Sequence, residues 1–153
     1  MKKTYLMTPG PTPVPPKALL AMAEPIIHHR TPEFMEIFKE VCADLKYIFQ
    51  TQSDVIVFTS SGTGAMEAAV ANLLSPGDKA ICVQGGKFGE RWTELCNAYG
   101  VNAIVIDVEW GKAVDPKIIE QELKKDSGIQ AVFTTLCETS TGVWFDTQAI
   151  KKA

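Results

Sequence analysis

The residues best suited to chemistry in this sequence lie in the stretch VIVFTSSGTGAME, residues 55–67. Its apolar start, Val55–Thr59, predicts a short buried strand, and the run from Ala65 predicts a helix. Hydroxyls and glycines form the turn between them. The first N–H groups of a helix have no partner within it, and the helix dipole favours negative charge there. We therefore predict that a phosphate-bearing ligand binds at three residues, Ser61, Gly62 and Thr63.

The same stretch has a simpler interpretation. It could be only a strand-to-helix turn in which a serine or threonine caps the helix. Gly-rich turns are common, so this motif alone does not decide between the two.

Two further loops carry side chains suited to binding a ring. The loop Gln84–Lys87 leads into Phe88, which could lie over a flat ring or could be a core residue at a helix start. The loop Cys137–Gly142 offers the hydroxyls of Thr139, Ser140 and Thr141 to a ring substituent. A phosphate, a flat ring and a hydroxyl contact together describe pyridoxal phosphate.

Glu138, in the last of these loops, has three possible roles. It could act as an acid or a base, it could cap a helix, or it could pair with a lysine. The neighbouring Cys137 ends a predicted strand beside the suspected site, but a free cysteine is usually a packing residue.

The elements that must position these loops alternate between strands and helices. Short apolar strands are predicted over Lys79–Val83, Asn102–Val108 and Gln130–Leu136. Helices are expected over 88–99 and 115–125 and from Asp146 onward. This alternation indicates an α/β fold in which a mostly parallel sheet is covered by helices on both faces. Ligands of such sheets bind beyond the carboxyl ends of the strands, where three of the four loops are the candidates described above.

The region before residue 55 lacks such strands. Residues 7–16 are Pro-rich and predict an extended arm, followed by a short helix to about Ala23. Thr31 and Pro32 predict the start of a long amphipathic helix over 32–50. The histidines at 28 and 29 are interpreted as structural, and the arginine at 30 could reach an anion as any exposed arginine could.

Composition excludes several classes of protein. The chain has 153 residues, 46% of them hydrophobic, and a net charge of −3. No basic cluster is dense enough to bind nucleic acid or a membrane surface. No signal peptide and no membrane span are predicted. The cysteines match no zinc-site spacing, which indicates free thiols in a reducing cytoplasm.

Taken together, the motifs make the chain resemble the N-terminal portion of a class V pyridoxal-phosphate-dependent aminotransferase. The alanine–glyoxylate, serine–glyoxylate and serine–pyruvate aminotransferases are of this kind. The matching segments follow one another along the whole chain: Thr8–Pro15, His29–Phe34, Ser61–Ala69, Pro76–Asp78, Gly86–Trp92 and Glu138–Val143.

The resemblance implies a role for each candidate residue. Ser61, Gly62 and Thr63 would hold the phosphate of pyridoxal 5'-phosphate, Phe88 would stack on its ring, and Thr139 would hydrogen-bond the phenolic oxygen. Gly10 would lie on the substrate side, and the region around His29 would lie near the interface of a homodimer. The substrates would be a small amino acid of the alanine or serine type and a 2-oxo acid of the glyoxylate or pyruvate type.

The resemblance also implies what these residues lack. In the family the aspartate at the pyridine nitrogen, the Schiff-base lysine and the arginine that holds the substrate carboxylate come later in the sequence. The Schiff-base lysine is therefore expected beyond Ala153. No residue here is assigned a catalytic role, and the 153-residue chain alone is expected to be inactive. Residues 1–20 would form the N-terminal arm, and 21–153 the first part of the large domain of fold type I.

A specific sheet order follows from that fold. The strands Lys79–Val83, Asn102–Val108 and Gln130–Leu136 would lie together with the first of them in the middle. Val55–Thr59 would lie apart, separated from them by later strands. We therefore expect Val55–Thr59 and one side of Gln130–Leu136 to have no ladder partner. The missing strands of the sheet would come from the rest of a longer protein or from a partner.

Other functions fit less well. A dinucleotide-binding unit needs a third glycine where Glu67 stands and an acid after the second strand, which ends in Val83-Gln84-Gly85. A serine hydrolase needs a G-x-S-x-G motif followed by a histidine. Within the family, a cysteine desulfurase, an epimerase or a protein described as a soluble hydrogenase subunit stays open. Outside it, the alternative is a truncated, non-catalytic phosphate-binding α/β domain.

Overall fold

A computed structural model describes residues 5–152. The first four residues of the expected arm lie outside the described residues. Ala153, beyond which the Schiff-base lysine is expected, also lies outside them, so the structure does not test that expectation. The chain divides into two compact units, of which one ends at Val57 and the other begins at Phe58.

The first unit is helical. It contains α1 (Pro16–Met22) and α2 (Pro32–Phe49), close to the predicted positions. The hydroxyl of Thr31 caps α2 by accepting a hydrogen bond from the Phe34 N–H at 3.3 Å. None of the described residues up to Val57 is buried. The apolar stripe of α2 is therefore at most partly covered by the described residues of this unit.

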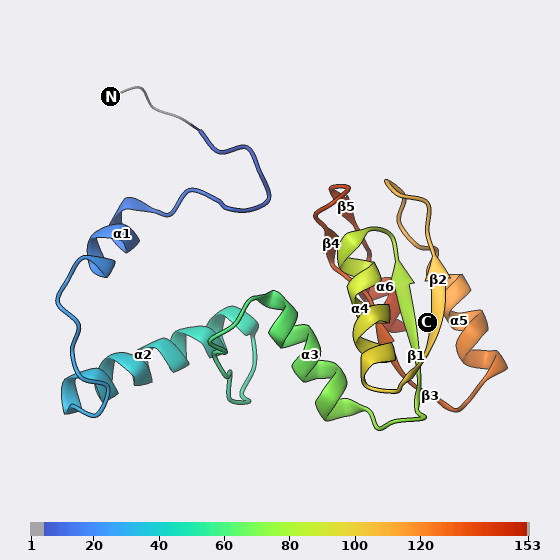
Figure 1. Cartoon of the computed structure of the whole chain (residues 1–153), viewed down its shortest axis with the longest axis horizontal. Coiled ribbons are helices and arrows are strands. Elements are labelled where there is room, and N and C mark those ends of the chain that lie inside the picture. The colour runs from blue at the N-terminus through green and yellow to red at the C-terminus, as the bar shows by residue number, and fades with distance from the viewer. Residues whose placement is uncertain (1–4, 153) are drawn as a thin grey trace. The chain divides into compact units, whose positions relative to one another are not determined.

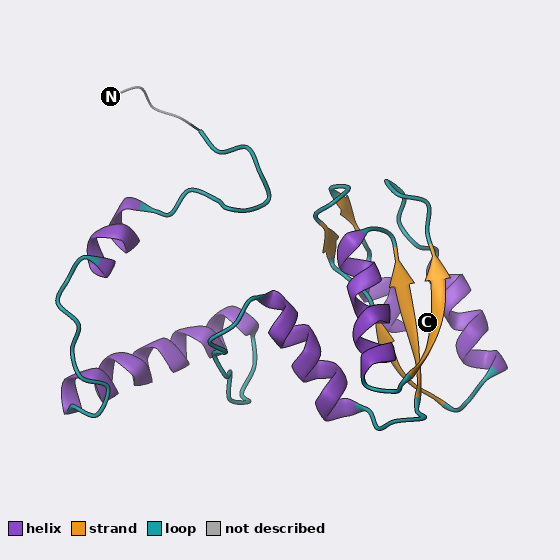
Figure 2. Ribbon diagram, in the orientation of Figure 1, coloured by secondary structure: helices purple, strands orange, loops and turns teal. Residues whose placement is uncertain are grey.

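The second unit contains the sheet. Its elements, in chain order, are α3 (Gly62–Leu73), β1 (Lys79–Gln84), α4 (Lys87–Ala98), β2 (Asn102–Asp107), α5 (Pro116–Lys125), β3 (Ile129–Phe133), β4 (Cys137–Glu138), β5 (Val143–Trp144) and α6 (Thr147–Lys152). Figure 1 labels these elements, and Figure 2 shows the strands between flanking helices.

Three strands form a parallel sheet in the order β2-β1-β3. Lys79 pairs with Asn102 on β2, and Ala80 pairs with Ala131 on β3. The first strand of the three lies in the middle, which confirms the predicted order. β3 has β1 on one side and no partner on the other among residues 5–152.

The two faces of the sheet carry separate cores, because the side chains of β1 alternate between them. Ala80 and Cys82 face a cluster that includes Val70 of α3 and Cys96 of α4. Ile81 and Val83 of β1 face the opposite side, where they belong to a cluster that includes Ile119 of α5. The predicted arrangement of a parallel sheet with helices on both faces is therefore confirmed.

The prediction of a strand over Val55–Thr59 is wrong, because these residues form no strand in the structure. Ile56 is 74% exposed and Val57 is 62% exposed. A strand exists only when its N–H and C=O groups pair with a neighbour, and no strand within residues 5–152 pairs with this segment. The predicted lack of a ladder partner is thus confirmed.

The end of the sheet near residue 137 also differs from the prediction. β3 ends at Phe133 rather than Leu136. The expected loop Cys137–Gly142 begins with β4, which pairs with β5 as a small antiparallel hairpin. Gly142 adopts a positive φ of 75° in its turn, a conformation that glycine reaches without strain. The hydroxyl-bearing residues 139–141 therefore lie in a tight turn.

Candidate functional site

The start of α3 is an open helix N-terminus. Ser61 is its N-cap residue, in an extended conformation, and its side chain makes no capping hydrogen bond. A β-carbon built on Gly62 would meet nothing within 4 Å, so the backbone is accessible there. The Gly64 N–H already donates to the Ser61 backbone oxygen at 3.0 Å, whereas the N–H groups of Gly62 and Thr63 have no acceptor among the described residues. The predicted phosphate cradle therefore has free donors.

Thr63 connects this cradle to α4. Its hydroxyl oxygen accepts a hydrogen bond from Nη1 of Arg91 at 2.9 Å, and Nε of Arg91 donates to the Glu94 carboxylate at 3.0 Å. The arrangement places a permanent positive charge beside the start of α3. Arg91 was not among the predicted site residues. The available signal was its spacing from Phe88, since residues three apart lie on the same face of a helix.

Phe88 lies in the first turn of α4, after the loop that follows β1. Its side chain is 48% exposed, so it is not part of the described core. Its N–H donates to the carboxylate of Glu138 at 3.3 Å. The ring is available to a ligand, while its backbone is fixed.

The carboxylate of Glu138 caps α4. It is fully buried and accepts a hydrogen bond from the Gly89 N–H at 2.9 Å and one from the Ser140 hydroxyl at 2.6 Å. Burial alone would raise the pKa of Glu138, but the bonds from Ser140, Gly89 and Phe88 together hold it below its usual value. Of the three roles open to Glu138, the structure shows the helix cap.

The three hydroxyls of the β4–β5 turn have different tasks. Ser140 bonds to Glu138, and Thr141 donates to the Glu138 backbone oxygen at 3.3 Å. The hydroxyl of Thr139 makes no hydrogen bond within the described part of the chain, and its side chain is exposed. Thr139 is therefore the hydroxyl left free for a ligand.

The structure brings several predicted residues together at the carboxyl ends of the strands. Arg91 links Thr63 to α4, and Glu138 links Phe88 to the turn that holds Thr139. Figure 1 shows the β4–β5 hairpin beside the start of α4. Gly10 lies in the first unit, where it is exposed, so its place on the substrate side stays a prediction.

Several other candidates were interpreted as structural or packing residues. The rings of His28 and His29 stack at 4.6 Å in the first unit, where Nδ1 of His28 accepts from the Arg30 N–H. Cys137 is an exposed free thiol, whereas Cys82 and Cys96 are buried. Residues 5–152 contain no group of three or more His, Cys, Asp or Glu arranged to hold a metal.

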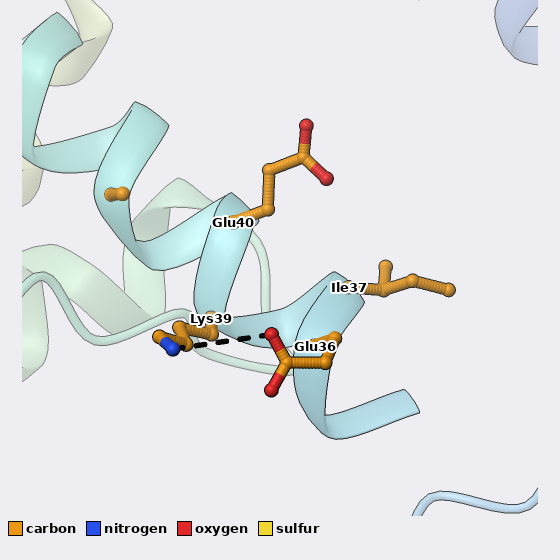
Figure 3. Close-up of a pocket in the computed structure, with 5 residues that line it drawn as sticks. Glu36, Ile37, Lys39 and Glu40 are labelled. Atoms are coloured by element: carbon orange, nitrogen blue, oxygen red, sulfur yellow. Dashed lines mark ion pairs between the residues drawn. The ribbon is translucent and has the colours of Figure 1, made fainter. Parts of the chain in front are cut away.

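Figure 3 shows a surface hollow on α2. It is lined by Glu36, Ile37, Lys39, Glu40 and Ala43. All of its lining residues come from one helix, and the Glu36–Lys39 ion pair at 3.9 Å is largely exposed. The hollow offers no convergent donors, and we assign it no role.

Comparison with known proteins decides the family. The sequence model described as aminotransferase class-V matches residues 4–153, nearly the whole chain. The chain belongs to the class V aminotransferase family.

This member of the class V aminotransferases is similar to three proteins that carry different names. A soluble hydrogenase 42 kDa subunit of Anabaena cylindrica is 51% identical over 150 residues, covering 97% of this chain and 39% of that protein. A serine–glyoxylate aminotransferase of Hyphomicrobium methylovorum is 40% identical over 152 residues, covering 97% and 38%. The crystal structure of an aspartate aminotransferase from Thermus thermophilus matches with a TM-score of 0.90 and 36% identity, over 97% of this chain and 41% of that one.

These matches confirm the predicted family and fold. The second unit has part of the large domain of the pyridoxal-phosphate transferase fold. The chain spans about two fifths of the length of the curated relatives it matches. None of the helices in residues 5–152 has the length and apolarity that crossing a membrane requires.

Proposed function

We propose that this chain supplies the phosphate- and ring-binding part of a pyridoxal-phosphate-dependent aminotransferase. The enzyme would transfer an amino group from a small amino acid of the alanine or serine type to a 2-oxo acid of the glyoxylate or pyruvate type. The observation that carries the proposal is the open N-terminus of α3 beside the Arg91–Thr63 hydrogen bond. An anion is the ligand that such a site favours.

The donor set fits pyridoxal phosphate. The Ser61 side chain is not used as a cap, and the backbone at Gly62 is open to a phosphate oxygen. Thr63 accepts a hydrogen bond from Arg91, so its own O–H can donate to the phosphate. Phe88 is half exposed and Thr139 has a free hydroxyl within the described part of the chain.

Each residue then has a limited task. Ser61, Gly62 and Thr63 would bind the phosphate, Phe88 would stack on the ring, and Thr139 would hold the ring's phenolic oxygen. When bound, the cofactor supplies an aldehyde that takes up the amino group and a ring that stabilises negative charge. The residues described here bind and orient it, and none of them is assigned a proton transfer.

The test uses the full-length protein. We expect it to take up pyridoxal phosphate, seen as visible absorbance, and to change that absorbance when an amino donor is added. Mixing alanine or serine with glyoxylate, or serine with pyruvate, should yield the 2-oxo acid of the donor and the amino acid of the acceptor. A full-length protein that takes up no pyridoxal phosphate contradicts the proposal and favours a non-catalytic phosphate-binding domain.

The same assays separate the other candidates. Sulfide release from cysteine would indicate a desulfurase, and inversion of an amino acid without transfer would indicate an epimerase. The name of the Anabaena cylindrica relative suggests a hydrogenase subunit, and hydrogen-dependent reduction of a dye would support that role. The hydroxyls, N–H groups and guanidinium at the site are donors for an anion, which favours a pyridoxal-phosphate enzyme over a hydrogenase subunit.

We further propose that the full-length protein is a cytoplasmic homodimer acting on small molecules, with no nucleic-acid or membrane partner. Support comes from the exposed apolar residues of α2, including Phe38 at 51% and Ile48 at 66%, and from four free cysteines. Light scattering of the full-length protein and cell fractionation test these two points.

A further inference from the structure

Glu138 is the only charged side chain that is buried among residues 5–152. Its Oε1 accepts from the Phe88 N–H at 3.3 Å, the Ser140 N–H at 3.3 Å and the Ser140 hydroxyl at 2.6 Å. Its Oε2 accepts from the Gly89 N–H at 2.9 Å. A buried carboxylate is tolerated only when its lone pairs are satisfied in this way.

Those contacts replace the local cap that α4 lacks. Its N-cap residue, Gly86, has no side chain to accept a hydrogen bond. Glu138 takes the N–H groups of Phe88 and Gly89, and the Ser140 hydroxyl accepts from the Lys87 N–H at 3.1 Å. The first three N–H groups of α4 are therefore all satisfied from the β4–β5 turn, and the negative charge complements the helix dipole.

Gly86 is required for this contact. A β-carbon at this position would lie 2.3 Å from the Ser140 hydroxyl oxygen and 2.6 Å from Cδ of Glu138. Any other residue would push the turn away from the helix start. The loop after β1 and the turn after β4 are thus held together at one buried carboxylate.

The position of this carboxylate matters for ligand binding. One of its donors is the backbone of Phe88, and Thr139 is its neighbour in the chain. These are the two residues that would contact the ring. We propose that Glu138 is a positioning residue, which fixes the Phe88 ring relative to the Thr139 hydroxyl and so sets the slot for a flat heteroaromatic ring. This inference rests on the proposed function.

The test compares ring binding with phosphate binding in the full-length apoprotein. E138Q keeps the shape of the side chain, but its amide NH₂ faces N–H donors and the charge is lost. We expect the affinity for pyridoxal phosphate to fall about tenfold, because hydrogen bonds to a charged group are weakened at the ring-contacting loops. The circular dichroism of the bound cofactor should also change. Competition by inorganic phosphate should be unaltered, since the hydrogen bonds of Glu138 go to α4 and the β4–β5 turn rather than to the start of α3.

D115N provides the matched control. The Asp115 carboxylate caps α5 by accepting from the Lys117 N–H at 3.0 Å, a bond that involves no candidate residue. It should lower thermal stability without changing the affinity for either ligand. Equal pyridoxal phosphate affinity in E138Q and wild type overturns the inference, as does an equal fall in the affinity for phosphate.

A second variant covers the case in which E138Q does not fold. S140A removes the hydroxyl that donates to Glu138 and accepts from Lys87, and should weaken pyridoxal phosphate binding about threefold with phosphate unaffected. Unchanged pyridoxal phosphate affinity in S140A then overturns the inference. If the wild-type protein binds no pyridoxal phosphate, the proposed function itself is contradicted. That result is distinguishable from a failure of the inference about Glu138, in which the wild type and the variants bind equally well.

Discussion

The guanidinium of Arg91 donates a hydrogen bond to the hydroxyl oxygen of Thr63 at 2.9 Å, joining the second turn of α4 to the first turn of α3. The two residues are 28 positions apart in the chain. An oxygen that accepts from a guanidinium is left with its proton directed elsewhere. At an open helix N-terminus, this orientation favours donation to an anion, and the arginine adds charge that the helix itself lacks.

The first prediction concerns Thr63. T63V removes the hydroxyl with little change in shape and leaves Arg91 without this acceptor. The full-length protein should lose roughly 1.5–3 kcal/mol of pyridoxal phosphate affinity, the usual worth of a hydrogen bond to a charged group. Equilibrium titration measures this. The same change at Thr147, which begins α6 on the other face of the sheet, should have no effect. Tight binding by T63V would contradict the phosphate assignment.

The second prediction concerns the charge of Arg91. Its side chain is 43% exposed, so solvent screens it and a modest effect is expected. R91Q should weaken inorganic phosphate binding to the full-length protein by roughly threefold at low salt, and less at high salt. K112Q, which removes an exposed charge paired with Glu109, serves as the control. Equal phosphate affinity in R91Q and K112Q at low salt would show that Arg91 serves only to pack α4.

The sequence predicted the elements of the second unit better than their contacts. The strands from Lys79 and Asn102 were found because their residues are apolar or β-branched and lie between clear turn signals. The role of Glu138 stayed open, because the helix that it caps lies about 50 residues away and no local pattern reports such a bond. Arg91 was missed because its partner Thr63 lies 28 positions away in the chain, and its spacing from Phe88 was the one local signal. Val55–Thr59 has the composition of a strand, but a strand also needs a neighbouring strand to hydrogen-bond with, and composition does not show whether one is present.

The third prediction concerns pH and Glu138. The pKa of this carboxyl is lowered in the folded state relative to its ordinary value of 4.5. Its contribution to stability is therefore fully present above about pH 4.5 and is lost as pH falls through the lower, folded value. Denaturant unfolding should show E138Q losing part of the acid dependence of the free energy of unfolding.

Asp126 provides a comparison for that experiment. Its pKa is also lowered, first by the hydrogen bond from Lys79 and then by the N–H of Gly128, but it lies at the surface. The part of the acid dependence removed by D126N should shrink in high salt, whereas the part removed by E138Q should not. Equal salt sensitivity of the two parts would mean that Glu138 is not buried in solution.

The fourth prediction is that the 153-residue chain forms no specific covalent adduct with pyridoxal phosphate. Lys87 is next to Phe88, but its ammonium pairs with Glu90, whose hydrogen bond raises the pKa of the lysine. A protonated amine is a poor nucleophile. Borohydride reduction followed by peptide mapping should show only scattered, substoichiometric labelling. One stoichiometric adduct on a single lysine would contradict this prediction, and with it the expectation that the Schiff-base lysine lies beyond Ala153.

The last prediction concerns the segment Val55–Thr59. Ile56, Val57 and Phe58 are exposed, with Phe58 at 51%, and no strand within residues 5–152 pairs with the segment. In the 153-residue chain its amides should exchange with solvent within seconds, while those of Ile81 and Val83 on the central strand should be protected. In the full-length protein we expect Val55–Thr59 to be a paired strand, with protection approaching that of β1, because a buried apolar strand must satisfy its backbone groups. Hydrogen exchange followed by mass spectrometry compares both proteins directly. Equal protection of Val55–Thr59 and β1 in the 153-residue chain would show that the segment pairs with another strand of this chain. The sheet order that the family resemblance implies, in which Val55–Thr59 lies apart, would then be wrong.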